Sequence, residues 1–289
     1  MSRCELSIVL PAKNESAALR VLLPRLYRAY PSAEIIVVDD GSTDDTRAVC
    51  EASKVRVLTH PYSKGNGAAI KTGARHARGD IIVFMDADGQ HDPADIHKLL
   101  HKIDKGYDLV VGAREQGSQA STARWLANSF YNRFASGFVG QPVADLTSGF
   151  RACRAALFRE FLHMLPNGFS YPTTSTMAFF RAGYSVGYVP IDVKKRAKGS
   201  SSHIRPLSDG ARFLLIIFRV GTLYSPLKLF IPISVLFFLS GMGYYAYTFC
   251  TMGRFTNGSA LLLITAVLVF LIGLVSEQIT YLLYSNLRD

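Results

Sequence analysis

Two long runs of residues without a charge constrain the fold of this chain more than any other feature. They extend from Leu229 to Gly253 and from Phe255 to Ser276, and only Arg254 separates them. Each run exceeds the roughly 20 residues that a helix needs to cross a bilayer. A buried hairpin in a soluble core is the other interpretation, but two consecutive runs of this length are rare in a soluble domain. The sequence therefore predicts two transmembrane helices, forming a hairpin over residues 227–289.

The charges around these runs predict their orientation. The segment from Lys194 to Lys228 is basic and contains one acidic residue, Asp209. Its basic residues are Lys194, Lys195, Arg196, Lys198, Arg205, Arg212, Arg219 and Lys228. Arg288 follows the second run, whereas the short connection holds only Arg254. The positive-inside rule then predicts an integral membrane protein with the large preceding domain and both termini in the cytoplasm.

The segment before the first run predicts a juxtamembrane amphipathic helix over residues 206–226. Arg205, Arg212 and Arg219 recur every seven residues among apolar side chains, a pattern typical of a helix in the membrane interface. The solvated face of a soluble helix would give a similar pattern. Much of the formal net charge of +10 lies between Lys194 and Lys228. Membrane lipids or a lipid phosphate are therefore expected as partners, and nucleic acid is not.

Residues 1–205 alternate between apolar runs and amphipathic segments, which predicts an α/β domain. The predicted strands are Leu6–Leu10, Glu34–Val38, Val55–Thr59, Ile81–Met85 and Asp108–Gly112. The predicted helices are Ser16–Ala29, a helix that opens at Lys64-Gly65-Asn66-Gly67 and ends near Gly79, and Asp92–Lys105. The loop glycines before the second helix could admit a ligand, but close helix-to-sheet packing is the preferred interpretation. No Gly-x-Gly-x-x-Gly or Walker sequence occurs, so carboxylates, a metal and arginines would have to hold any phosphate.

An acidic turn follows the fourth predicted strand. Asp86-Ala87-Asp88-Gly89-Gln90 brings two carboxylates and an amide to one point. Oxygen ligands of this kind suit Mg²⁺ or Mn²⁺, which keep coordination positions open for a substrate's phosphates. An ordinary turn that caps a helix is the alternative. The pattern indicates a site for a nucleotide diphosphate.

Taken together, four ordered motifs resemble family 2 glycosyltransferases, and within them the polyprenyl-phosphate branch that includes dolichyl-phosphate mannose synthase. The motifs are Pro11-Ala-Lys-Asn-Glu15, Val38-Asp-Asp-Gly-Ser-Thr-Asp44, Asp86-Ala-Asp-Gly-Gln90 and Asp145-Leu-Thr-Ser-Gly-Phe150, and the resemblance covers most of residues 5–205. It implies a GT-A (Rossmann-like) catalytic domain over residues 1–205, a nucleotide diphosphate sugar as donor, Mg²⁺ or Mn²⁺ as cofactor, and inverting transfer of a hexose or N-acetylhexosamine to undecaprenyl or dolichyl phosphate.

The resemblance also implies roles for individual residues. The donor nucleoside would be surrounded by Pro11, Lys13, Glu15, Val38 and Asp40. The nucleotide sugar would also meet Asp86, Ala87, Asp88, Arg114 and Arg196, and the metal would be held by Asp86, Asp88 and Gln90. The acceptor phosphate would be bound by Arg124, Asn128 and Ser148. Asp88, Arg114 and Arg196 are expected to serve catalysis directly.

The chain departs from the family pattern at two positions. Arg196, Gly199 and Ser201 match an Arg-x-x-Gly-x-Ser-Lys segment, but Ser202 stands where its lysine is expected. Lys13 stands where mannose synthases often have an aromatic residue. The choice between UDP and GDP donors therefore stays open, as does the sugar.

The distribution of carboxylates favours a phosphate acceptor. No Asp or Glu occurs from Phe161 to Ile191, the stretch where hydroxyl-directed relatives usually carry a general base. A lipid phosphate is already an anion at neutral pH and needs no deprotonation before attack. Asp145 is the nearby carboxylate, and it is interpreted as orienting the Thr147-Ser148-Gly149 loop, with a base role as the alternative.

Two other functions are compatible with parts of the sequence. A processive polysaccharide synthase would share the fold, but Ser121 occupies the glutamine position of its Gln-x-x-Arg-Trp motif, and two spans are few for a polymer channel. A membrane-anchored nucleotide-sugar binding protein without turnover is the second alternative. Small residues such as Gly241 and Gly243 make a homo-oligomer plausible. Glu277, inside the second apolar helix, is expected to pack subunits or line the lipid headgroup path, or else to lie at the interface.

Overall fold

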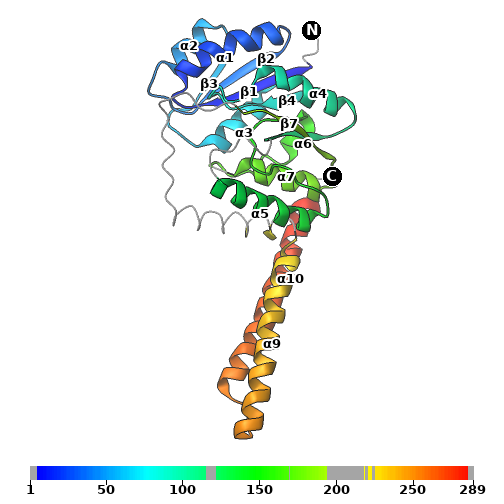
Figure 1. Ribbon diagram of the computed structural model, residues 1–289. Helices are drawn as coiled ribbons and strands as arrows, with labels where there is room; N and C mark the ends of the chain where they lie inside the picture. The colour runs from blue at the N-terminus through cyan, green and yellow to red at the C-terminus, as the bar shows by residue number, and fades with distance from the viewer. Residues whose placement is uncertain are drawn as a thin grey trace. The chain divides into compact units, whose positions relative to one another are not determined.

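The computed structural model describes residues 5–114, 122–168, 170–193, 218, 221–222 and 225–285; at 122–128, 130, 134 and 283–285 it describes the backbone alone. The chain divides into two compact units, Met1–Ile204 and Arg205–Asp289. The predicted juxtamembrane helix falls almost entirely outside the described residues. The two units are described separately below (Figure 1).

The first unit is built on a seven-stranded sheet with the order β3-β2-β1-β4-β6-β5-β7. The strands are β1 (Leu6–Ala12), β2 (Glu34–Asp39), β3 (Arg56–Thr59), β4 (Ile81–Phe84), β5 (Leu109–Arg114), β6 (Arg151–Arg154) and β7 (Val186–Ile191). All pairings are parallel except those of β6, which lies antiparallel between β4 and β5. The first five strands lie within two residues of their predicted bounds.

Helices connect these strands. They are α1 (Ser16–Ala29), α2 (Thr46–Ala52), α3 (Asn66–His76), the short 3-10 helix η1 (Pro93–Asp95), α4 (Ile96–Asp104), α5 (Thr122–Val139), α6 (Ala155–Glu160) and α7 (Tyr171–Arg181). The predicted helix Asp92–Lys105 is thus split into η1 and α4. Asp92 explains the start, because its side chain accepts a hydrogen bond from the Ala94 N–H and Pro93 follows it.

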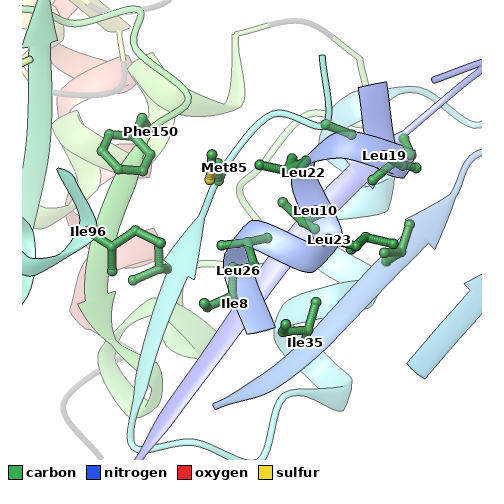
Figure 2. Packing of buried hydrophobic residues seen from close by; sticks show 14 of the residues in the cluster. Ile8, Leu10, Leu19, Leu22, Leu23, Leu26, Ile35, Met85, Ile96 and Phe150 are labelled. Carbon is green, nitrogen blue, oxygen red and sulfur yellow. The ribbon is translucent and has the colours of Figure 1, made fainter. Parts of the chain in front are cut away.

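The principal core lies between the sheet and helices α1 and α4. Leu19, Leu22, Leu23 and Leu26 recur at helical spacing on α1 and are buried. Figure 2 shows these leucines packed over Ile8, Leu10 and Ile35 of the first two strands. Met85, which directly precedes the acidic turn, belongs to the same cluster, as do Ile96 and Phe150. This packing gives the ends of β1, β2 and β4 a rigid support.

The second unit contains two long apolar helices, α9 (Pro226–Met252) and α10 (Asn257–Ser285). Both are long and apolar enough to cross a membrane. Glycines allow the two helices to approach closely, since a Cβ at Gly273 would lie 2.6 Å from Phe230 Cβ. Gly241 likewise faces Leu262 and Leu263 of α10, whereas a Cβ at Gly243 would meet no atom of the described residues within 4 Å. Gly241 therefore serves the hairpin itself.

Glu277 of α10 has a definite role within this hairpin. Its carboxylate accepts hydrogen bonds from the Leu227 N–H at 3.1 Å and the Ser225 hydroxyl at 3.4 Å, at the start of α9. The first N–H groups of a helix lack partners within the helix and favour a negative charge. Glu277 therefore caps α9 from the neighbouring helix, a role that its position in the sequence did not suggest.

Candidate active site

The carboxyl ends of three parallel strands form one edge of the sheet. The chain passes from β1 to β2 and β3 on one side, and β4 then pairs with the other side of β1. Open α/β sheets bind ligands at such a switch point. The motif beginning at Pro11 and the Asp39-Asp40 pair include the last residues of β1 and β2, and the acidic turn follows β4. The sheet topology thus brings three predicted site segments together.

The first two segments meet around Asp40, which is buried. Its carboxylate accepts hydrogen bonds from His60 Nδ1 at 2.7 Å, the Ser63 hydroxyl at 2.8 Å, and the N–H groups of Lys64 and Gly65 at 2.8 and 2.9 Å. Burial by itself would raise the pKa of Asp40, but these donors lower it to about 2. Lys13 Nζ donates to the same Ser63 hydroxyl at 3.0 Å. Asp40 is therefore an ionised group that holds the 63–65 loop.

The other predicted nucleoside residues occupy neighbouring positions. Pro11 and Val38 are register partners on β1 and β2. Val38 is fully buried, whereas Lys13 is exposed. Glu15 precedes α1, and its N–H donates to the Thr46 hydroxyl. The side chains of Lys13 and Asp40 therefore converge on Ser63, and Val38 contributes packing beneath them.

The acidic turn follows β4 and bends at Gly89, whose φ of +73° glycine adopts without steric cost. Ala87 is buried, and the Asp88 carboxylate accepts a hydrogen bond from the Gln90 N–H at 3.1 Å. The Asp86 side chain is 37% exposed, and its Oδ2 lies 4.0 Å from Nε2 of His91. The His91 ring stacks on Phe150 with centroids 4.9 Å apart. Asp86, Asp88 and Gln90 therefore share one turn, as the sequence predicted.

Arg114 and Asp145 form the second part of the site. Arg114 Nε donates to Asp145 Oδ2 at 2.7 Å and its Nη2 donates to Oδ1 at 3.0 Å. The same carboxylate also accepts from the Thr147 hydroxyl and the N–H groups of Thr147 and Ser148. Burial would raise the pKa of Asp145, but the hydrogen bonds and the charge of Arg114 keep it below its ordinary value. The predicted orientation of the Thr147-Ser148-Gly149 loop by Asp145 agrees with these contacts.

The loop after Asp145 connects the two parts of the site. A Cβ on Gly149 would lie 2.9 Å from Asp86 Oδ2 and 3.2 Å from its Oδ1. The backbone of Gly149 is therefore in contact with the acidic turn, while the preceding residue, Ser148, donates its N–H to Asp145. Ser148 is buried, and its hydroxyl has no hydrogen-bond partner among the described residues.

Comparisons with known proteins identify this arrangement. Residues 7–163 match the family described as Glycosyl transferase family 2, and residues 225–282 match the GtrB C-terminal hairpin. The chain belongs to glycosyl transferase family 2. The family assignment implied by the four sequence motifs is therefore confirmed, and the protein is a glycosyltransferase.

Relatives of this family 2 glycosyltransferase act on polyprenyl phosphates. Polyprenol monophosphomannose synthase of Mycolicibacterium smegmatis is 31% identical over 221 residues, covering 68% of this chain and 82% of the relative. Undecaprenyl-phosphate mannosyltransferase of Micrococcus luteus is 34% identical over 211 residues, covering 67% and 85%. The resemblance to the polyprenyl-phosphate branch is confirmed by these relatives.

A solved structure shares the fold of the catalytic unit. Glucosyl-3-phosphoglycerate synthase from Mycobacterium tuberculosis, in complex with Mn²⁺, UDP and glucosyl-3-phosphoglycerate, has a TM-score of 0.57 and 25% identity. The match covers 75% of this chain and 80% of the synthase. The predicted GT-A architecture is therefore confirmed.

The residues of the family 2 acidic turn suit a divalent cation. Two carboxylates and a glutamine amide are hard oxygen donors, and few protein ligands are typical of a cation that also binds substrate phosphates. Within the described ranges no group of three or more His, Cys, Asp or Glu side chains could hold a metal by itself. The Gln90 amide is the third oxygen donor that this turn offers.

Three further predicted residues belong to segments that are not fully described. Arg124 and Asn128 lie in α5, but their side chains are outside the described part of the chain. Arg196 also lies outside it, together with the segment that contains Ser202.

The glycines at the start of α3 serve packing, but Gly65 and Gly67 pack against the 166–168 loop and not against the sheet as expected from the sequence. A Cβ on Gly67 would lie 2.0 Å from the Pro166 carbonyl oxygen, and the Ala68 N–H donates to the Asn167 carbonyl at 2.8 Å. N–H groups in the first turn of α3 therefore donate hydrogen bonds to carbonyl groups of the chain itself. The helix start is used for chain contact and does not resemble a phosphate-binding loop.

Sequence reasoning missed two residues beneath the Ser148–Gly149 loop. Arg151 and Tyr171 are both almost completely buried, and each donates a hydrogen bond to the loop's carbonyl groups. Neither is distinctive by spacing, although an arginine directly after the Gly149-Phe150 pair, within a short apolar strand, was a usable signal.

Proposed function

We propose that this family 2 enzyme transfers a sugar from a nucleotide diphosphate sugar to a polyprenyl phosphate at the cytoplasmic face of a membrane. The observation that carries this proposal is the engagement of Asp145 by Arg114 and the Thr147–Ser148 loop. A carboxylate held in this way, with a lowered pKa, is a poor general base. An acceptor that is already anionic, such as a lipid phosphate, needs none.

The donor half of the proposed site is the edge formed by β1, β2 and the acidic turn. Asp86, Asp88 and Gln90 would hold Mg²⁺ or Mn²⁺, and Lys13 and Asp40 lie where the nucleoside is expected. The 25% identical synthase that binds Mn²⁺ with UDP supports this assignment. When bound, the cation would supply positive charge to the leaving diphosphate. Asp88 and its turn then serve to fix the position of the donor.

The acceptor half is basic. Arg114 would lie between the two phosphate groups, while Arg124, Asn128, Ser148 and Arg196 would bind the lipid phosphate from the segments around it. Arginine suits this task because its planar fork matches two phosphate oxygens. The unpartnered, buried hydroxyl of Ser148 supports a polar ligand nearby.

The proposed chemistry is a single inverting displacement. An oxygen of the lipid phosphate attacks the anomeric carbon from the side opposite the diphosphate, the new carbon–oxygen bond forms, and the bond to the nucleotide diphosphate breaks. Arg114 stabilises charge in this process and no proton needs to be removed from the acceptor. The transferred sugar is a hexose or an N-acetylhexosamine.

The membrane hairpin suits an isoprenoid acceptor. In this proposal the catalytic domain comprises residues 1–205, an amphipathic helix follows over 206–226, and residues 227–289 cross the membrane twice, which leaves both termini in the cytoplasm. Gly243 on the outer face of α9 could meet another subunit, which supports a homo-oligomer.

The test uses membranes that contain the full chain, labelled UDP- and GDP-sugars, and undecaprenyl or dolichyl phosphate. We expect one donor to give a metal-dependent, organic-extractable product whose anomeric configuration is opposite to that of the donor. Asp88→Ala should abolish this product, and Asp104→Ala, which removes an exposed carboxylate at the end of α4, should not.

The outcomes separate the alternatives. A polymer on a gel would indicate a processive synthase, and nucleotide-sugar binding without product from any donor would indicate a binding protein. Full activity of Asp88→Ala would refute the assigned donor site.

A further inference from the structure

Arg151 is a cation in the interior of the catalytic unit. It begins β6, its relative exposure is 0%, and among the described residues no carboxylate lies within salt-bridge distance of its guanidinium. Burial of an unpaired charge is costly unless hydrogen bonds replace the lost water. We therefore ask which hydrogen bonds stabilise the Arg151 guanidinium and what they hold in place.

The hydrogen bonds of Arg151 connect two segments of the fold. Nη1 donates to the Pro172 carbonyl at 2.9 Å, the Ser175 hydroxyl at 2.7 Å and the Thr176 hydroxyl at 3.2 Å, all on α7. Nη2 donates to the carbonyl of Ser148 in the site loop. The planar fork serves the two directions from separate nitrogen atoms, whereas a lysine ammonium would have to serve both from a single nitrogen.

Tyr171 complements this arrangement at the next residue of the loop. Its ring lies against the guanidinium, with 5.6 Å between the arginine Cζ and the ring centroid. Its hydroxyl donates to the Gly149 carbonyl at 3.2 Å. Arg151 and Tyr171 thus bind two successive carbonyl groups, those of Ser148 and Gly149, and they also contact each other.

The same two loop residues also contact two carboxylates of the site, those of Asp145 and Asp86. The Ser148 N–H donates to Asp145, and the Gly149 backbone leaves less than a methyl group's space beside Asp86. Arg151 is also the register partner of Phe84 in β4, two residues before Asp86. A shift of the Ser148–Gly149 peptide would therefore be transmitted to Asp86.

We propose that Arg151 and Tyr171 are positioning residues for the nucleotide diphosphate, because they hold the Ser148–Gly149 peptide that fixes the Asp86 carboxylate. This inference rests on the proposed function, since it assigns Asp86 to the donor half of the site. Neither residue touches the substrate. Their effect is on the geometry that the donor meets.

The test compares Tyr171→Phe with Tyr131→Phe in the purified full chain. Tyr171→Phe keeps the ring against Arg151 and removes only the hydrogen bond to Gly149. Tyr131→Phe removes an equally buried hydroxyl that donates to Thr173, also on α7, at 3.2 Å. Calorimetry measures the affinity for UDP and for GDP, each with Mn²⁺, and kinetics with the active donor measures KM and kcat separately.

We expect Tyr171→Phe to weaken binding of the preferred nucleotide about fivefold, the effect of losing one hydrogen bond. The KM for the donor should rise accordingly, while kcat stays unchanged and the KM for polyprenyl phosphate changes less, because Tyr171 binds the Gly149 carbonyl and not that of Ser148. Tyr131→Phe should bind the nucleotide like the wild type even where its Tm falls. Arg151→Lys, which keeps the charge without the fork, should weaken binding further.

The inference is overturned if Tyr171→Phe binds the nucleotide like the wild type, or if Tyr131→Phe weakens binding equally, which would show a general loss of stability. A change confined to the KM for polyprenyl phosphate would also overturn it. If the wild type binds neither nucleotide, the proposed function itself fails, and the inference fails with it. Should Arg151→Lys not fold, the two tyrosine variants still decide the question.

Discussion

Replacement of Gly149 by alanine tests whether the site loop really fixes the acidic turn. Gly149 does not adopt a positive φ, so the backbone itself accepts an alanine. The new Cβ would lie 2.9 Å from Asp86 Oδ2, whereas ordinary contacts begin at 3.4 Å. The Tyr171 hydroxyl, 3.3 Å from the same Cβ, blocks a simple shift in the other direction. The Asp86 carboxylate must therefore move by about half an ångström or rotate away.

The magnitude follows from this displacement. A misplacement of about 1 Å in a catalytic arrangement costs roughly 100-fold in rate, so kcat/KM should fall about 10- to 100-fold. The cost in stability is smaller, because the Asp86 side chain is 37% exposed and can yield toward solvent. Overpacking lowers the free energy of unfolding by about 1–3 kcal/mol. Replacement of glycine by alanine raises it by about 0.4–1 kcal/mol, because alanine restricts the conformations of the unfolded chain. The Tm should therefore fall by only a few degrees, about 2–8 °C.

The assay measures sugar transfer to polyprenyl phosphate and thermal unfolding of the same preparations. Gly168→Ala is the matched control, since a Cβ at that exposed loop position would meet no atom within 4 Å in the part of the chain that the structure describes. It should retain the wild-type kcat/KM. Wild-type kcat/KM in Gly149→Ala would refute the reasoning, and so would an equal loss in Gly168→Ala.

Three further predictions concern the metal, the Asp40 carboxylate and the membrane hairpin. Chelation with EDTA should abolish transfer, and Mn²⁺ or Mg²⁺ should restore it in the wild type but not in Asp88→Ala; transfer that survives chelation would contradict the metal assignment. Because the folded pKa of Asp40, about 2, lies below its ordinary value of 3.8, its stabilising effect is fully present above about pH 4 and is lost as the pH falls toward 2. Asp40→Asn should therefore cost about 2 kcal/mol in the free energy of unfolding at neutral pH, and denaturant titrations should show the difference from wild type shrinking below pH 4. Glu277→Leu should cost about 1 kcal/mol by removing the cap of α9, measured as a lower Tm in detergent, with the KM for the donor unchanged; an unchanged Tm would show that the cap contributes nothing.

Much of the fold could be predicted because its signals are local. The apolar runs that become β1, β2 and β4 are bounded by turn residues, and the leucines of α1 recur at helical spacing. The acidic turn, from Asp86 to Gln90, is also local, since its ligands lie within five consecutive residues. The two long apolar helices also follow from the length and composition of their segments.

The position of β6 could not be predicted in the same way. The strand Arg151–Arg154 is only four residues long, and it enters the sheet antiparallel between β4 and β5. Nothing in its own sequence reports which strands it joins. Its placement nevertheless decides the site, because it brings the Ser148–Gly149 loop against Asp86 and positions Arg151 beneath it.

The sequence by itself determined the family, the acidic turn and the apolar C-terminal hairpin, because each depends on residues that are neighbours along the chain. Only the tertiary structure decided that Arg114 forms an ion pair with Asp145, 31 residues along the chain, and that the Asp40 carboxylate accepts hydrogen bonds from the 63–65 loop. It also decided that Glu277 caps α9 and that Arg151 is buried. These features depend on contacts between distant segments, and packing of the whole sheet sets which polar groups lose water and must find partners in the protein.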